Sequence, residues 1–210
     1  MGLRELKAER VRARILDVAL DLFMTHGFAG TSMEQIAERA EVGSTTLYRY
    51  FPSKDHLALG PFNYSLRLGD ALRGRPVSEP LAESLGAVIL GALDVHMDDV
   101  TRLSAVLHVM DSNPGTRAAL WDLLEEGREN LGAALAERMG TEPTSTAVVL
   151  ASRLAFSIWE LAWVRWGTDP SRSIESRGTE VLTELRSLQL VLPTVPTGTP
   201  DAADTNPVGD

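Results

Sequence analysis

Residues 31–54 read TSMEQIAERAEVGSTTLYRYFPSK, and this stretch decides the fold of the amino-terminal part of the chain. A first short helix with Ile36 and Ala37 on its inner side is followed by a break at residues 41–44. A second short helix then runs to Pro52. Two short helices joined by a tight turn form a helix-turn-helix, which places its second helix in the major groove of DNA. The stretch therefore predicts a DNA-reading unit.

Capping signals mark the helix starts in this stretch. Both the Thr31–Glu34 pair and the Ser32–Gln35 pair have the spacing of a capping box, in which a hydroxyl and the third side chain satisfy backbone N–H groups. Ser53 is placed to cap a further helix. The sequence leaves open which of the two pairs forms the box.

The predicted turn leaves polar side chains of the second helix on the outer surface. Hydroxyl groups suit phosphate oxygens, and an arginine can bind a guanine edge with two hydrogen bonds. Arg49 fits a base contact or a phosphate contact equally, and Tyr48 fits either a DNA contact or the core. A basic arm at the amino terminus can follow the phosphates or enter the minor groove. The predicted DNA-binding residues are Arg4, Lys7, Arg10, Thr31, Ser32, Ser44, Thr45, Thr46, Tyr48, Arg49, Tyr50 and Lys54.

A set of residues with fixed spacing runs through residues 10–57. Its members are Phe23, Phe28, Thr31, Ser32, Ile36, Ala37, Ala40 and Val42, followed by TLYRYFPSK at residues 46–54. This pattern resembles the DNA-binding domain of the TetR family of bacterial repressors. The resemblance implies an all-α protein with three amino-terminal helices for DNA. It also implies a helical bundle that dimerises and encloses an effector pocket.

Residues 41–43 depart from the pattern of that family, in which glycine and then Val-Ser commonly stand. If Glu41 takes a left-handed backbone conformation, it costs about 1 kcal/mol relative to glycine. Gly43 removes a hydroxyl that could contact DNA, and Ser44 is placed to replace it.

The charge divides the chain in two. Residues 1–60 hold eight Lys and Arg and eight Asp and Glu, so the whole net charge of −9 belongs to residues 61–210. This asymmetry favours two functions in one chain, although an ordinary basic helix start would also explain the arm. We expect a DNA-binding domain over residues 1–56, an effector-binding and dimerisation domain over 57–192, and a disordered tail over 193–210.

The second part reads as long helices near residues 79–97, 100–111, 115–139, 144–167 and 173–191, which gives an all-α fold of about nine helices. The chain has no cysteine, which excludes disulfides and thiolate chemistry. The absence of a long uninterrupted apolar run and of a signal-peptide core favours a cytoplasmic protein with no membrane span.

Residues 148–166 are apolar nearly all round, as in a helix buried on more than one side. Trp159, Trp163 and Trp166 share one face, which fits core packing or the aromatic wall of a ligand pocket. The predicted pocket residues are His96, Met97, Met110, Trp121, Phe156, Trp159 and Trp163, with His108 as a further polar candidate; the histidines and methionines also fit structural roles. The resemblance implies a dimer through the last two long helices. The predicted interface residues are Ala151, Leu154, Ala155, Ile158, Ala162, Leu182, Leu185 and Gln189.

These features predict a homodimeric repressor that a small, largely apolar or aromatic ligand releases from a near-palindromic operator. We expect no enzyme and no cofactor, since HExxH, GxSxG and phosphate-binding glycine motifs are absent. We also expect no metal, because residues 96–99 offer only one histidine beside carboxylates. The alternative is an architectural DNA-binding protein without an effector. The acidic second part argues against it, because such proteins gain affinity from widespread positive charge.

Overall fold

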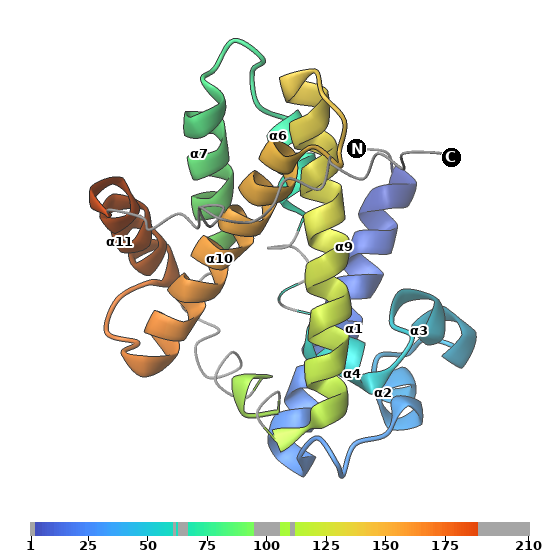
Figure 1. The fold of residues 1–210 in the computed structure, drawn as a ribbon. Helices are drawn as coiled ribbons and strands as arrows, with labels where there is room; N and C mark the ends of the chain where they lie inside the picture. Colours follow the sequence, from blue (N-terminus) through green and yellow to red (C-terminus); the bar gives the residue numbers. More distant parts are fainter. Residues whose placement is uncertain (1–2, 61, 63–66, 95–105, 110–111, 189–210) are drawn as a thin grey trace, which may run out of the picture.

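The computed structural model describes residues 3–60, 62, 67–94, 106–109 and 112–188, and these residues contain helices and no strand. The helices in chain order are α1 (Leu3–His26), α2 (Met33–Arg39), α3 (Ser44–Tyr50), α4 (Lys54–Ala58), α6 (Leu68–Arg73), α7 (Leu81–Leu93), α9 (Pro114–Met139), α10 (Thr146–Thr168) and α11 (Ile174–Ser187) (Figure 1). The predicted all-α fold is confirmed.

The long helices lie close to their expected positions. The ranges near 115–139, 144–167 and 173–191 correspond to α9, α10 and α11. Gly140 follows α9 with a left-handed backbone, as a glycine helix stop requires. The expected helix near 100–111 lies mostly outside the described residues, as do Gln189 and the whole predicted tail.

The capping box of α2 forms through the second of the two predicted pairs. The Ser32 hydroxyl accepts from the Gln35 backbone N–H at 3.2 Å, and the Gln35 side chain accepts from the Ser32 backbone N–H at 2.8 Å. Thr31 instead turns inward and is 2% exposed. Its hydroxyl hydrogen lies within reach of the carbonyls of Gly27 (2.9 Å) and Leu22 (3.3 Å), so Thr31 ties the loop before α2 to α1.

Glu41 adopts the left-handed conformation that its position in the turn implied, with φ of 54°. The conformation costs about 1 kcal/mol relative to glycine. Its carboxylate meets the Arg14 guanidinium of α1 at 2.6 Å, and both side chains are more than half exposed. An exposed pair of this kind contributes little stability, so the strain is offset mainly by the packing of α2 against α3.

The carboxy-terminal body is built around α10, which contacts α7, α9 and α11. In Figure 1, α2 and α3 lie at one lower corner of the molecule, and α11 lies on the opposite side of it. By length and composition alone α10 could cross a membrane. Its buried residues, which include Phe156 and Trp166, pack into the core, so its apolar character is that of a central helix in a helical bundle.

Candidate functional site

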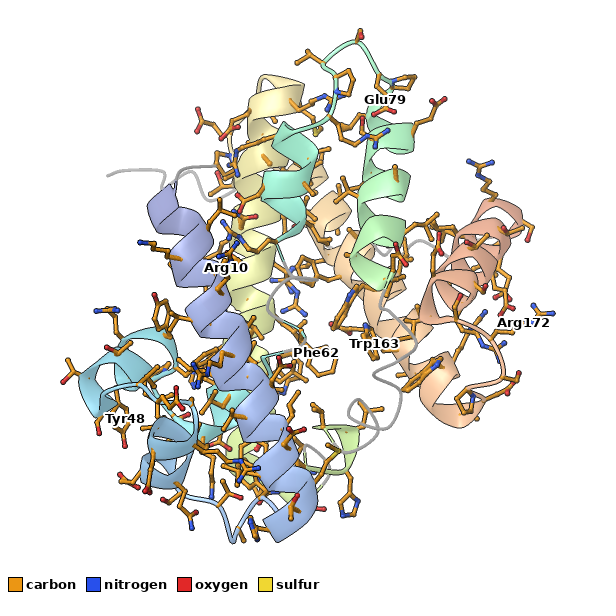
Figure 2. The ribbon with its side chains drawn as sticks, turned by 180° about the vertical axis from the view of Figure 1, so that it is seen from behind. Arg10, Tyr48, Phe62, Glu79, Trp163 and Arg172 are labelled. Carbon is orange, nitrogen blue, oxygen red and sulfur yellow. The ribbon has the colours of Figure 1, made fainter. Side chains whose placement is uncertain are left out.

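The outer face of α3 is polar and exposed. Ser44, Thr45 and Arg49 are exposed, and Tyr48 has 46% of its surface exposed. Figure 2 shows Tyr48 at the outer edge of the molecule. Leu47 on the opposite side is fully buried and fixes α3 against the neighbouring helices. The arrangement presents hydroxyl groups, a phenol and a guanidinium on one rigid helix.

Two predicted contacts on α3 are half-buried. Thr46 and Tyr50 have intermediate exposure. The Arg49 guanidinium lies 5.1 Å from the centre of the Tyr50 ring, which holds both side chains near the end of the helix. Arg49 forms no ion pair with a described carboxylate, so its charge remains available to an anion.

Lys54 points inward rather than outward. Its ammonium donates hydrogen bonds to the carbonyls of Phe28 (2.7 Å) and Thr31 (2.8 Å) and lies 4.4 Å from the centre of the Phe28 ring. Sequence reasoning assigned Lys54 and Thr31 to DNA contact. The structure instead places both polar groups in the joint between α1, α2 and α4, because backbone carbonyls of the loop need donors there.

The basic arm lies along the first turns of α1. Lys7 and Arg10 are exposed there, as a phosphate contact requires. The side chain of Arg4 lies outside the described residues. Ser32 is half-buried and engaged in its capping box.

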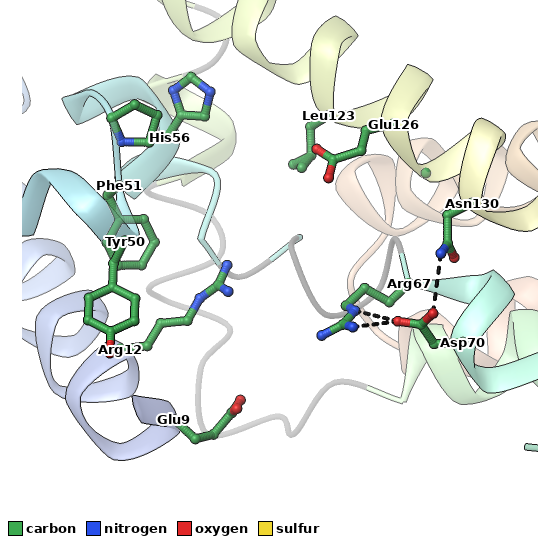
Figure 3. Close-up of a pocket in the computed structure, with 12 residues that line it drawn as sticks. Glu9, Arg12, Tyr50, Phe51, His56, Arg67, Asp70, Leu123, Glu126 and Asn130 are labelled. Carbon is green, nitrogen blue, oxygen red and sulfur yellow. Dashed lines mark hydrogen bonds and ion pairs between the residues drawn. The ribbon is translucent and has the colours of Figure 1, made fainter. Parts of the chain in front are cut away.

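A polar cavity of about 580 Å³ lies between the DNA-reading helices and the carboxy-terminal body. Figure 3 shows Arg12 and Tyr50 on one side of it and Arg67, Asp70 and Asn130 on the other. Asp70 accepts from Asn130 at 3.2 Å and from Arg67 at 2.7 Å. The hydrogen bond from Asn130 is the main cause of a lowered Asp70 pKa; the two neighbouring arginines add to it and burial opposes it. Among the described residues, the junction between the two parts therefore contains open space.

Helix α4 joins the two parts on its other side. The Thr116 hydroxyl, in the first turn of α9, donates to the Asp55 carboxylate at 2.6 Å, and Thr116 is fully buried. Lys54 is the neighbouring residue and binds the loop before α2. Hydrogen bonds from two neighbouring residues of α4 thus reach both the start of α9 and the loop before α2.

A second cavity, which we call the aromatic cavity, lies between α9 and α10 and has a volume of about 750 Å³. Trp121, Trp159 and Trp163 of the predicted pocket line it together. Figure 2 shows Phe62 and Trp163 facing one another, with their ring centres 4.9 Å apart. Among the described residues, no group of three or more histidine or acidic side chains is placed to hold a metal ion.

Of the other predicted pocket residues, Phe156 does not line this cavity. Phe156 is fully buried beside the Arg128 guanidinium, 5.6 Å from its ring centre, because it lies on the core side of α10. His96, Met97 and Met110 lie outside the described residues. His108 lines the cavity. Trp166, which shares a face with Trp159 and Trp163, also lines it. Phe62 and Leu120 line it too, and the sequence pattern carried no signal for them.

The outer side of α10 is an exposed apolar stripe. Leu150, Leu154, Leu161 and Val164 recur at helical spacing and are each at least 44% exposed. We call these four residues the α10 stripe. The predicted interface shares only Leu154 with it.

The remaining predicted interface residues lie elsewhere. Ala155, Ile158 and Ala162 are buried against the chain's own core, because the inner side of α10 is as apolar as its outer side. Ala151, Leu182 and Leu185 are partly buried and pack beside that core.

Residues 15–60 match the sequence profile described as bacterial regulatory proteins, tetR family. The chain is 34% identical over 148 residues to the HTH-type transcriptional regulator TcmR of Streptomyces glaucescens; the alignment covers 67% of this chain and 66% of that relative, just under two thirds of its length. It is 28% identical over 164 residues to the HTH-type transcriptional repressor KstR of Rhodococcus jostii, with 78% of this chain and 76% of that relative covered.

Solved structures show the same fold. The transcriptional regulator FadR of Bacillus subtilis, solved in complex with stearoyl-CoA, matches with a TM-score of 0.54 at 21% identity, over 82% of this chain and 96% of FadR. A transcriptional regulator from Aquifex aeolicus matches with a TM-score of 0.52 at 17% identity, over 84% of this chain and 98% of the other. At these identities the likeness concerns the fold alone.

Proposed function

Because the chain belongs to the TetR family of bacterial regulatory proteins, we propose that it is a transcriptional repressor that binds operator DNA as a homodimer and leaves it when a small molecule binds. The observation that carries this proposal is the outer face of α3. Ser44, Thr45, Tyr48 and Arg49 stand exposed on a helix whose opposite side is buried. Hydroxyl and guanidinium groups on such a helix suit phosphates and base edges in the major groove.

The α10 stripe supports the homodimer. Four large apolar side chains at helical spacing are unfavourable in water and are buried when the same face of a second copy meets them. A twofold dimer presents two α3 helices, which is the arrangement that a near-palindromic site requires.

The aromatic cavity supports an effector. It lies beside α9, and the first turn of α9 is tied to α4 through Thr116 and Asp55. A ligand that favours one position of α9 over another shifts the angle of the DNA-reading unit, and only such a difference in affinity can drive release. The polar cavity of Figure 3 leaves room for this change.

The architectural alternative predicts a solidly packed carboxy-terminal half. A cavity of about 750 Å³ between α9 and α10 favours the effector-responsive repressor instead. We assign the chain no catalytic role and place it in the cytoplasm, where operator DNA is found.

Selection of DNA from a random duplex pool with the purified full chain tests the DNA-binding part. We expect enrichment of a near-palindromic sequence bound by two copies of the chain. Arg49→Ala should weaken binding to that sequence by about 1–3 kcal/mol in free energy. Arg186→Ala, an exposed arginine on α11, is the control and should bind normally. Binding without sequence preference would contradict the proposal and support the architectural alternative.

A further inference from the structure

Three buried indole groups gather at the aromatic cavity. Trp159, Trp163 and Trp166 all line it, and they are 3%, 7% and 2% exposed. Their indole nitrogens are covered in this structure and have no hydrogen-bond partner among the described residues. The three come from one helix at spacings of four and three, so one face of α10 carries them all.

Buried donors without an acceptor are unusual. An indole N–H can only donate, and most buried donors in folded proteins find a partner. The rings stand edge to face: Trp163 and Trp166 have centres 5.9 Å apart at 79°, and Phe62 and Trp159 have centres 5.9 Å apart at 78°. Contacts of N–H groups with ring faces are weak, so this arrangement does not replace three hydrogen bonds.

The described wall around the three indoles is largely apolar or basic. Leu120 and Leu124 are apolar, and Arg117 can only donate. The Glu160 carboxylate accepts from Arg128 at 3.2 Å, and His108 also lines the cavity. Neither side chain pairs with the three indole N–H groups, so the described part of the wall combines flat aromatic surface with three unpaired donors.

We propose that this cavity takes a flat ring compound that carries acceptor oxygens, such as carbonyl groups, and that the indole N–H groups of Trp159, Trp163 and Trp166 donate to those oxygens. The proposal rests on the proposed function, in which the aromatic cavity holds the effector. Because the indole nitrogens are covered in this structure, the rings turn about their side-chain torsions as the compound enters. This rotation of the indole rings replaces weak contacts between rings with hydrogen bonds to the compound. The cavity therefore prefers ring compounds that carry oxygen to plain hydrocarbons.

A matched pair of probes, fluorenone and fluorene, tests the proposal with the full chain. The two have the same three-ring frame, and only fluorenone has a carbonyl oxygen. We expect fluorenone to bind at least about tenfold more tightly, the difference that one hydrogen bond of ordinary strength makes. In proton–nitrogen correlation spectra, the indole proton signal of at least one of the three residues should move downfield with fluorenone. Fluorene controls for shifts caused by ring currents.

Single Trp→Phe variants separate the N–H group from the ring. Trp163→Phe and Trp166→Phe keep an aromatic side chain and remove the donor. We expect at least one of them to weaken fluorenone binding about tenfold and to leave fluorene binding unchanged. These variants also assign the indole signals. Thr183→Val is the control, since it removes a donor hydroxyl from α11 at a residue that does not line the cavity.

Equal binding of the two probes, binding of neither, or unchanged fluorenone binding in both variants would overturn the inference. Operator binding measured on the same samples keeps this result apart from a failure of the proposed function. If the chain binds its operator but binds fluorenone and fluorene with equal affinity, only the inference about the ligand is wrong. A chain that binds no specific DNA sequence contradicts the proposed function whatever the probes do.

Discussion

Two exposed helical faces among the described residues differ in chemistry. The outer face of α3 carries Ser44, Thr45, Tyr48 and Arg49, while the α10 stripe carries only large aliphatic side chains. The first is well solvated by itself and gains affinity from phosphates and base edges. The second is poorly solvated and gains stability when apolar surface covers it. The difference fits the two partners of the proposed function, DNA for α3 and a second copy of the chain for α10.

Breaking the apolar face should have the largest effect. Leu161→Arg places a charge in the middle of the α10 stripe, which is buried in the proposed dimer. We expect monomers in analytical ultracentrifugation. We also expect operator affinity to fall about 100-fold or more, because the second half-site loses its tethered partner. Both effects come from one substitution far from α3.

Val77→Arg is the matched control, since Val77 is 85% exposed on the segment before α7 and away from the stripe. It should leave both dimerisation and operator binding unchanged. A Leu161→Arg protein that remains dimeric would refute the assignment of the stripe to the dimer interface.

The two faces also differ in how far the sequence alone could predict them. Around α3, the turn residues and the caps of the neighbouring helices α2 and α4 set the structure locally, so the exposed positions Tyr48 and Arg49 follow from the pattern. Helix α10 is apolar nearly all round, so the spacing of its apolar residues does not indicate which side packs against the core. Tertiary neighbours decide this, which is why Ile158 is buried and Leu161 is exposed.

Polar residues with inward partners were the second source of difference. Thr31 and Lys54 have the polar side chains expected of DNA contacts. Both instead donate hydrogen bonds to backbone carbonyls of the loop between α1 and α2. The need of those carbonyls for donors arises from the path of the backbone, which sequence pattern does not reveal.

A substitution at Lys54 tests whether this residue stabilises the fold or contacts DNA. Lys54→Met leaves the carbonyls of Phe28 and Thr31 without their donor, at a cost of about 1–3 kcal/mol in the free energy of unfolding. We expect the salt dependence of operator binding to stay the same, because the ammonium already has inward partners. Denaturant unfolding and binding titrations at several salt concentrations measure the two effects.

Lys7→Met is the contrasting variant, since Lys7 is exposed on α1. It should leave unfolding unchanged and reduce the salt slope by about one, as the loss of one phosphate contact does. If Lys54→Met behaved in this way instead, Lys54 would belong to the DNA-binding face.

A smaller effect is expected where the two parts of the chain meet. Thr116→Val keeps the shape of the side chain and removes the hydroxyl that donates to Asp55. We expect a loss of about 1 kcal/mol in stability. The change in operator affinity caused by a releasing ligand should also become smaller, because α9 is no longer tied to α4.

Thr183→Val serves as the control for this change. The Thr183 hydroxyl donates to the Thr179 carbonyl within α11, away from α4. Normal ligand-dependent release in the Thr116→Val protein would show that the Thr116–Asp55 hydrogen bond does not couple the two parts.

The smallest effect is expected at Glu79, whose carboxylate is already paired with Arg75 and Ser84 of the same chain. The Arg75 hydrogen bond, followed by the one from Ser84, lowers the pKa of Glu79 from its ordinary 4.5 to about 2. A carboxyl whose pKa is lowered by folding stabilises the protein above pH 4.5, and this stabilisation is lost as the pH falls from 4.5 toward 2. Glu79→Gln should therefore lower Tm slightly at pH 7, and its difference from the wild type should shrink steadily through that acid range.

Glu83→Gln, an exposed glutamate in the first turn of α7, controls for general charge effects. A Tm difference for Glu79→Gln that stayed constant from pH 7 to pH 3 would mean that the side chain acts through packing alone. Because Glu79 belongs to neither the outer face of α3 nor the α10 stripe, dimerisation and operator binding should be normal in this variant at pH 7. The interactions of Glu79 are satisfied within one chain, in contrast to the α10 stripe, which a partner covers in the proposed dimer.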